Sequence, residues 1–150
     1  MLACSPPAPA QNASTDNATA AESGAQTGLR EVPLTIRSSN GTHRFTVEVA
    51  ATPEQQERGL MFRKSIAGDR GMIFPYDPPA DVSFWMKNTW IPLDIIFIRS
   101  DGTIVRITHA EAMDLTPLPA GEPVAAVLEI RAGRAAELGI KEGDVASWTH

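Results

Sequence analysis

The folded part of the chain begins where strict alternation of apolar and polar residues begins. Val32, Leu34 and Ile36 lie on one face of a predicted strand, and the polar residues between them lie on the other. Asn40 and Gly41 then predict a two-residue hairpin turn, because both residue types tolerate positive φ. A returning strand with apolar residues at every second position follows this turn. The domain is therefore predicted to open with a β-hairpin.

The clearest helix start in the sequence follows this hairpin. Thr52 can cap a helix, a proline suits the first helical position after it, and Gln55 stands three residues after Thr52, as in a capping box. We expect a short helix over residues 53–61. A second short helix is predicted over residues 134–138, where Gly139 would end it.

The remaining apolar runs are short and are separated by turn residues, which predicts further strands. An almost continuous apolar run over residues 93–98 indicates a central strand that is covered on both faces. Other strands are predicted over residues 72–74, 83–87, 103–108, 124–130 and 145–148. Because no long helices separate these strands, the pattern favours a mostly β fold: a compact, mainly antiparallel β-sandwich or partly closed barrel with two short helices.

The first 30 residues differ in composition from the rest of the chain. They carry one basic and two acidic residues and no aromatic residue, and Ala, Ser, Thr, Asn, Gln and Pro dominate them. Such a segment buries too little apolar surface to offset the entropy lost on ordering it. We expect residues 1–30 to form a lipoprotein-like N-terminus and disordered tether, and residues 31–150 to form a single β-rich domain.

The single cysteine of the chain, Cys4, stands near the start of this tether. Leu2 and Ala3 before it and the polar stretch after it resemble the cleavage box of a bacterial lipoprotein. The resemblance implies a lipid on Cys4, which would hold the domain at a membrane surface without crossing the membrane. It also implies a periplasmic or extracellular location, at the outer membrane if the source is Gram-negative. A single cysteine has no partner for an internal disulfide.

The overall charge of the chain argues against one class of function, the binding of nucleic acid. The 150 residues include 13 basic and 18 acidic side chains, which give a net charge of −5 at pH 7. A dedicated nucleic-acid binder usually needs a basic face, so we expect no nucleic-acid partner. The sequence shows neither a nucleophile-elbow serine nor a Gly-rich phosphate loop, and we expect no cofactor. No complete catalytic constellation can be assembled, which favours a non-catalytic protein.

Four ordered motifs mark the centre of the chain. They are Arg58-Gly59-Leu60-Met61, Gly71-Met72-Ile73-Phe74, Phe84-Trp85-Met86-Lys87-Asn88-Thr89 and Ile91-Pro92-Leu93-Asp94-Ile95-Ile96-Phe97. With Val127-Leu128-Glu129 further on, they closely resemble the bacterial and archaeal family known as domain of unknown function 192, over roughly residues 33–148. The resemblance implies a small β-rich domain, often exported, with no settled biochemical activity to transfer.

A polar and aromatic rim is the first candidate site. Lys87 and Asn88 precede a tight connection between two predicted strands and Asp94 follows it, so antiparallel pairing would bring Lys87 close to Asp94. Arg58 could receive an anionic group, and Trp85 could stack on a sugar ring. We expect Arg58, Trp85, Lys87, Asn88 and Asp94 to bind a small polar or glycan-like ligand. The alternative is a structural ion pair beside an asparagine that closes a turn.

The alternative function is that of a hydrolase or lyase. Asp94 and Glu129 each stand in an apolar strand, where burial would raise the pKa of a carboxyl group and let it act as a general acid. Two such groups about 5–10 Å apart in one pocket could form an acid/base pair. Alternation alone also explains one polar residue in a strand, so Glu129 could instead face solvent or pair with a nearby arginine.

A lesser alternative is copper binding. Met61, Met72 and Met86 belong to the motifs, and thioether groups can hold Cu(I). Methionine is also a flexible filler of apolar cores, and the tight Met-x-Met or Met/His spacing of soft-metal sites is absent. Core packing is the favoured role for all three methionines.

Overall fold

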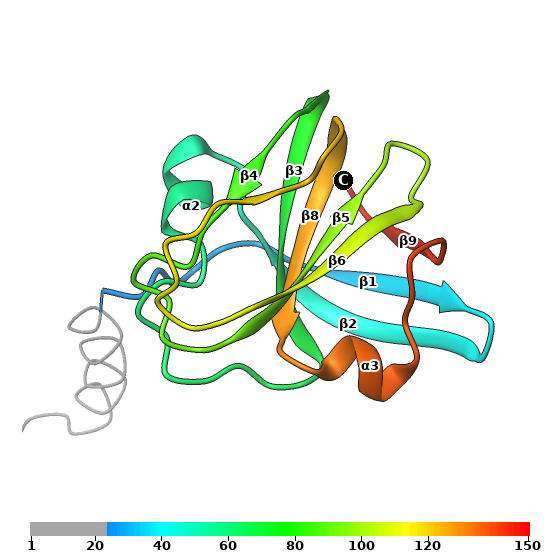
Figure 1. The fold of residues 1–150 in the computed structure, drawn as a ribbon, viewed down its shortest axis with the longest axis horizontal. Coiled ribbons are helices and arrows are strands. Elements are labelled where there is room, and N and C mark those ends of the chain that lie inside the picture. The colour runs from blue at the N-terminus through cyan, green and yellow to red at the C-terminus, as the bar shows by residue number, and fades with distance from the viewer. Residues whose placement is uncertain (1–23) are drawn as a thin grey trace, which may run out of the picture.

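The computed structural model describes residues 24–150 as a curled β-sheet with two short helices (Figure 1). The strands are β1 Glu31–Ser38, β2 Gly41–Val49, β3 Arg70–Ala80, β4 Ser83–Phe84, β5 Leu93–Ile98, β6 Ile104–Ala110, β7 Leu118–Pro119, β8 Val124–Arg131 and β9 Val145–Trp148. The helices are α2 Pro53–Arg58 and α3 Arg134–Leu138. In this part of the chain, neither helix has the length and apolar character that a membrane-spanning helix needs.

Seven strands form one sheet in the order β6-β5-β8-β3-β2-β1-β9, and β4 pairs with β7 in a small second sheet. Within the large sheet every pair is antiparallel except β2 with β3. The sheet curls until its edges meet. Thr103, just before β6, bridges to Val145 of β9, and the Ala146 amide donates to the Gly102 carbonyl at 2.8 Å. The predicted fold class, in its form of a partly closed barrel, is confirmed.

The large sheet separates two apolar clusters. One cluster lies inside the curl and includes Leu34 and Leu128; we call this side of the sheet the barrel face. The other cluster lies on the opposite side, under α2 and the second sheet, and includes Leu60 and Phe97; we call this side the α2 face. All six residues of β5 are buried, because this strand contributes to both clusters. The continuous apolar run over residues 93–98 predicted this double burial.

Two predicted elements are shorter in the structure. The first helix ends at Arg58 rather than at residue 61, because Gly59 at φ 47 turns the chain out of the helix. The predicted strand over residues 83–87 is reduced to β4, which pairs with β7 and not with β5. Beyond β4 the chain leaves the sheet and runs beside the loop that precedes β7, where the Met86 amide donates to the Asp114 carbonyl at 2.9 Å.

The N-terminal segment contacts the domain earlier than predicted. Gln26 Nε2 donates to the carbonyl oxygens of Gln55 and Gly59, both at 2.9 Å, and Leu29 packs against the α2-face cluster. Residues 24–30 therefore belong to the folded domain and not to the tether predicted over residues 1–30. The rest of that predicted tether, including Cys4, lies outside the described residues.

Closure of the barrel depends on a glycine. Gly102 has φ 91, and a Cβ atom there would lie 2.6 Å from the Ala146 carbonyl oxygen. Gly143 has a similar φ of 96, but nothing lies within 4 Å of its Cβ position. An alanine strains the backbone at both positions because φ is positive. Only at Gly102 would its Cβ atom also clash with a neighbouring atom. We expect Gly102→Ala to lower the free energy of unfolding by about 1–3 kcal/mol more than Gly143→Ala.

Urea unfolding of the two alanine variants measures this difference directly. Equal losses would show that the close approach of the Gly102 turn to β9 does not contribute to stability.

Candidate functional site

Helix α2 is fixed over the sheet by its own polar side chains. Thr52 and Gln55 form the predicted capping box, in which the Gln55 amide donates to Thr52 Oγ1 and the Thr52 amide donates to Gln55 Oε1, both at 3.2 Å. Gln56 Nε2 donates to the carbonyl oxygens of Ala50 and Pro75 at 3.0 Å each. These bonds hold α2 against β3 and the end of β2.

Glu129 lies on the face that α2 covers. In β8 it pairs with Met72 of β3 and with Ile95 of β5, and strand alternation places it on the α2 face with Val127. Only 4% of its surface is exposed. Among residues 24–150, no group donates a hydrogen bond to its carboxyl oxygens and no cation pairs with them. Within this part of the chain, Glu129 neither faces bulk solvent nor pairs with an arginine.

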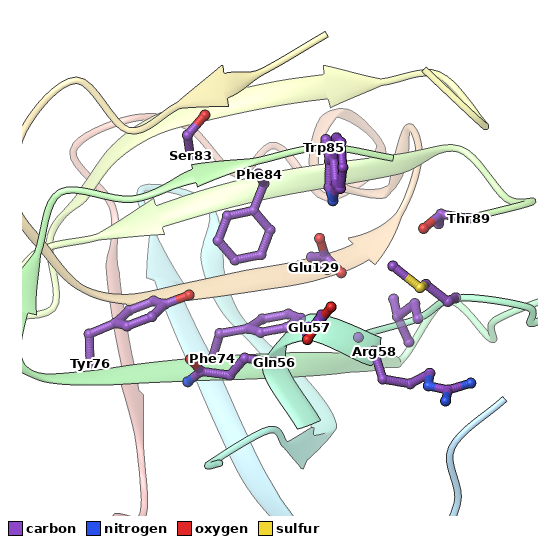
Figure 2. A pocket seen from close by; sticks show the side chains of 13 residues that line it. Gln56, Glu57, Arg58, Phe74, Tyr76, Ser83, Phe84, Trp85, Thr89 and Glu129 are labelled. Atoms are coloured by element: carbon purple, nitrogen blue, oxygen red, sulfur yellow. The ribbon is translucent and has the colours of Figure 1, made fainter. Parts of the chain in front are cut away.

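The Glu129 side chain reaches a pocket of about 190 Å³ between α2 and the second sheet. Figure 2 shows the carboxyl group in the middle of the view, with Phe84 and Trp85 on one side of it and Phe74 and Glu57 on the other. The lining comprises Gln56, Glu57, Arg58, Gly59, Leu60, Met61, Phe74, Tyr76, Ser83, Phe84, Trp85, Thr89 and Glu129. We call this space the Glu129 pocket.

Burial controls ionisation in the Glu129 pocket. Loss of hydration raises the pKa of Glu129 from its ordinary 4.5 to about 8. Burial also raises the pKa of Tyr76, and the nearby Glu129 carboxyl raises it further. At neutral pH Glu129 is therefore mainly a carboxylic acid and Tyr76 a phenol, and each can donate and accept a hydrogen bond.

The structure brings four of the five predicted binding residues to one end of α2. Arg58, Lys87 and Asn88 line a hollow next to the Glu129 pocket, and Trp85 lines the Glu129 pocket itself. Lys87 Nζ lies 5.2 Å from the centre of the Trp85 ring. Arg58 is engaged by the N-terminal segment, since its Nη1 donates to the Gly24 carbonyl at 2.6 Å. The predicted rim exists, but without Asp94.

Asp94 lies on the barrel face instead. Its Oδ2 accepts a hydrogen bond from the Ala135 amide at 3.0 Å, and its Oδ1 lies 3.7 Å from His109 Nδ1. The carboxyl group thus caps the start of α3, where Gly133 has no side chain to do so. The predicted approach of Lys87 to Asp94 is wrong, because β4 and β5 do not form a hairpin.

The predicted acid/base pair of Asp94 and Glu129 is not formed either. In the β5–β8 pair, Asp94 stands opposite Ile130, and Ile95 stands opposite Glu129. Consecutive residues of a strand point to opposite faces, so the sheet itself separates the two carboxyl groups. The two carboxyl groups do not share a pocket.

The three motif methionines differ in their surroundings. Met72 and Met86 are fully buried in the α2-face cluster, whereas Met61 is partly exposed and lines the Glu129 pocket. Core packing accounts for the two buried methionines. Within residues 24–150, no group of three His, Cys, Asp or Glu side chains is placed to hold a metal ion.

Comparison with known proteins assigns the chain to a family. The family model DUF192, described as "Uncharacterized ACR", matches residues 35–148. The chain belongs to the DUF192 family. The resemblance drawn from the four motifs is thereby confirmed. None of the curated proteins matches this DUF192 chain.

Two solved structures are similar to this DUF192 chain. A protein of unknown function from Novosphingobium aromaticivorans is 49% identical, with a TM-score of 0.79 over 81% of this chain and 88% of that chain. A Sinorhizobium meliloti protein, described as a "putative transcription regulator", is 40% identical, with a TM-score of 0.79 over 82% of this chain and 97% of that chain. Both proteins share the fold of the DUF192 domain.

Most of the residues that line the Glu129 pocket were not predicted from the sequence, Glu57, Phe74 and Phe84 among them. Phe74 and Phe84 were indistinguishable from core residues, and Glu57 is one of several polar residues in a helix without any buried position. Which way Glu57 points depends on the placement of α2, for which the sequence has no local signal. The sequence feature that could have located this site was Glu129, the single carboxyl group of the mostly apolar strand β8.

The buried Glu129 carboxyl makes stability depend on pH. Its pKa is near 4.5 in the unfolded chain and about 8 in the folded protein, so the folded state holds one additional proton between these pH values. The resulting contribution to stability is complete below about pH 4.5, decreases as the pH rises, and is lost above about pH 8.

We expect the free energy of unfolding of the wild type, relative to that of Glu129→Gln, to fall by about 1.4 kcal/mol per pH unit within this window. Glutamine keeps the shape of the side chain and does not titrate. Urea unfolding of both proteins between about pH 5 and pH 9 measures the difference. A difference that is constant across this range would contradict a titrating carboxyl group buried at this position.

Proposed function

We propose that this DUF192 chain is a non-catalytic cell-envelope module that binds a small polar or glycan-like ligand in the Glu129 pocket. The observation that carries the proposal is the Glu129 carboxyl group, which is buried, reaches the pocket and has no hydrogen-bond partner within residues 24–150. Burying such a group unpaired is unfavourable, and a ligand that completes its hydrogen bonds removes part of the penalty.

The surroundings of Glu129 support a small ligand. A concave site that combines apolar walls with polar groups can bind a small molecule, and a volume of about 190 Å³ suits a ligand below drug size. The rings of Phe84 and Trp85 offer flat apolar surfaces. Lys87 and Asn88 in the neighbouring hollow are placed to contact a part of the ligand that extends from the pocket.

The placement of Asp94 argues against the predicted acid/base pair. The hydrolase alternative needed Asp94 as the second carboxyl group, and Asp94 is on the other side of the sheet, where it caps α3. The description of the Sinorhizobium meliloti protein as a regulator of transcription belongs to that protein. The net charge of −5 in this chain gives no electrostatic support for binding nucleic acid.

Two-dimensional ¹⁵N–¹H NMR of the full chain tests binding with chitotriose, benzyl alcohol and benzamide as probes. We expect at least one probe to shift the amide signals of Gly59, Phe84 and Glu129. In Glu129→Leu the affinity should fall at least about tenfold, because the hydrogen bonds to the ligand are lost. Asp94→Asn changes the buried carboxyl group of the opposite face and should leave the affinity unchanged.

Failure of every probe to shift these signals would contradict the proposed function. Hydrolysis of chitotriose that Glu129→Leu abolishes would replace it with a catalytic one.

We also propose that a lipid on Cys4 anchors the protein at the periplasmic or outer face of a membrane. The support is the Leu2-Ala3-Cys4 sequence and the polar stretch that follows it. We expect mass spectrometry of membrane fractions from the native host to find a diacylated Cys4. Cys4→Ser should move the protein to the soluble fraction. An unmodified Cys4 in soluble wild-type protein would contradict the anchor.

A further inference from the structure

The charged side chains of the Glu129 pocket favour a cation. Two carboxyl groups line it, Glu129 from β8 and Glu57 from α2. Arg58 is the single basic residue of the described lining, and its guanidinium is engaged elsewhere: Nη1 donates to the Gly24 carbonyl, and the group lies 5.5 Å from the centre of the Phe62 ring. Figure 2 shows the guanidinium directed away from Glu129. An anion bound beside Glu129 would therefore meet two carboxyl groups without a free positive charge.

The walls of the pocket also favour a cation. Four aromatic residues line it, Phe74, Tyr76, Phe84 and Trp85. The faces of aromatic rings carry partial negative charge and attract ammonium groups, most strongly where water is excluded. Trp85 already contacts one cation, because Lys87 Nζ lies 5.2 Å from its ring centre, and Lys87 lines the neighbouring hollow rather than this pocket.

Two of the aromatic walls, Phe74 and Phe84, are held in place by packing. Phe84 meets Phe74 edge to face, with ring centres 5.0 Å apart, and meets Phe97 in the same way at 6.3 Å. Phe74 and Phe97 are fully buried in the sheet. A ligand that enters the pocket therefore meets these two walls already in place, which reduces the ordering that opposes binding.

We propose that the Glu129 pocket binds the ammonium group of a small organic cation, with Glu129 as its counter-ion and the aromatic side chains as its walls. This inference rests on the proposed function and names the ligand class. A volume of about 190 Å³ limits the bound part to a small group such as an alkylammonium or trimethylammonium head. Burial of the Glu129 side chain strengthens its Coulomb attraction to a cation.

Binding of a cation must be coupled to ionisation of Glu129. Burial raises the pKa of Glu129 to about 8, so most molecules carry the proton at neutral pH. A bound cation stabilises the carboxylate and lowers this pKa, so binding below pH 8 releases the proton. The other titratable residues that line the pocket are Glu57 and Arg58 from α2 and Tyr76 from β3, and of these the Arg58 guanidinium points away from Glu129 (Figure 2). The lining from β4 and the loop after it, Ser83, Phe84, Trp85 and Thr89, is uncharged.

The test compares choline with 3,3-dimethylbutan-1-ol, a neutral molecule of nearly the same shape. The charge of choline does not titrate, so any pH dependence comes from the protein. Isothermal titration calorimetry of the full chain between pH 6 and pH 9 should show choline affinity rising by up to about tenfold per pH unit and levelling off above pH 8. The affinity of the neutral molecule should not rise.

Two variants distinguish the contribution of the Glu129 charge to choline binding from that of the Glu57 charge. Glu129→Gln should weaken choline binding at pH 9 at least about tenfold and remove its pH dependence, because the negative charge is gone. Glu57→Gln should weaken binding without moving the pH at which affinity levels off. The different stability profile of Glu129→Gln shows independently that this variant folds.

Equal affinities for choline and its neutral analogue at pH 9, or a choline affinity unchanged by Glu129→Gln, would overturn the inference. If chitotriose, benzyl alcohol or benzamide shifts the pocket amides and choline does not, the ammonium inference fails and the proposed function stands. If no probe binds, both fail.

Discussion

Strands β3, β8 and β5 carry apolar side chains on both faces, and this double burial requires two separate coverings. The barrel face is covered when the sheet curls and β9 meets the turn before β6. The sheet cannot also curl over its other face. That face is covered by α2, by the β4–β7 pair and by the loops around them, and the Glu129 pocket lies where these short elements meet.

Glu129 departs from the apolar pattern of β8 at the point where this covering is incomplete. An apolar side chain of similar size would give more stability here, because the carboxyl group is removed from water without receiving a partner from residues 24–150. A residue that departs from the apolar pattern of its strand, and that receives no partner from the fold, is expected at a functional position. The low polarity that makes the charged group unfavourable also strengthens any interaction that a ligand makes with it. The unfavourable burial of Glu129 and the ligand binding that we propose for the pocket thus have one physical origin.

Asp94 shows that a second buried carboxyl group, in a neighbouring strand, can have a different role. Both carboxyl groups are nearly fully buried and belong to neighbouring strands. Asp94 meets the free amide of Ala135 at the start of α3, so its hydrogen bond is supplied by the fold. Glu129 faces α2, whose side chains Glu57 and Arg58 provide no such donor. The partners on each face, and not burial alone, distinguish a structural carboxyl group from a candidate binding group.

The sequence by itself determined the elements that depend only on residues close together in the chain. The β1–β2 hairpin, the capping box at Thr52 and the buried strand 93–98 follow from backbone preferences and apolar patterning. The hairpin turn itself lies one residue earlier than predicted, at Ser39 and Asn40, because Ser38 pairs with Gly41. Glu129 stood out as a carboxyl group in a mostly apolar strand. The tertiary structure alone decided that β4 pairs with β7, that residues 24–30 join the domain, and that Asp94 and Glu129 face opposite sides. In a strand that is buried on both faces, apolar residues occupy both faces. The apolar pattern therefore does not reveal which face a given side chain joins. The direction of each side chain is therefore set by register with strands distant in the sequence, and no local pattern records that register.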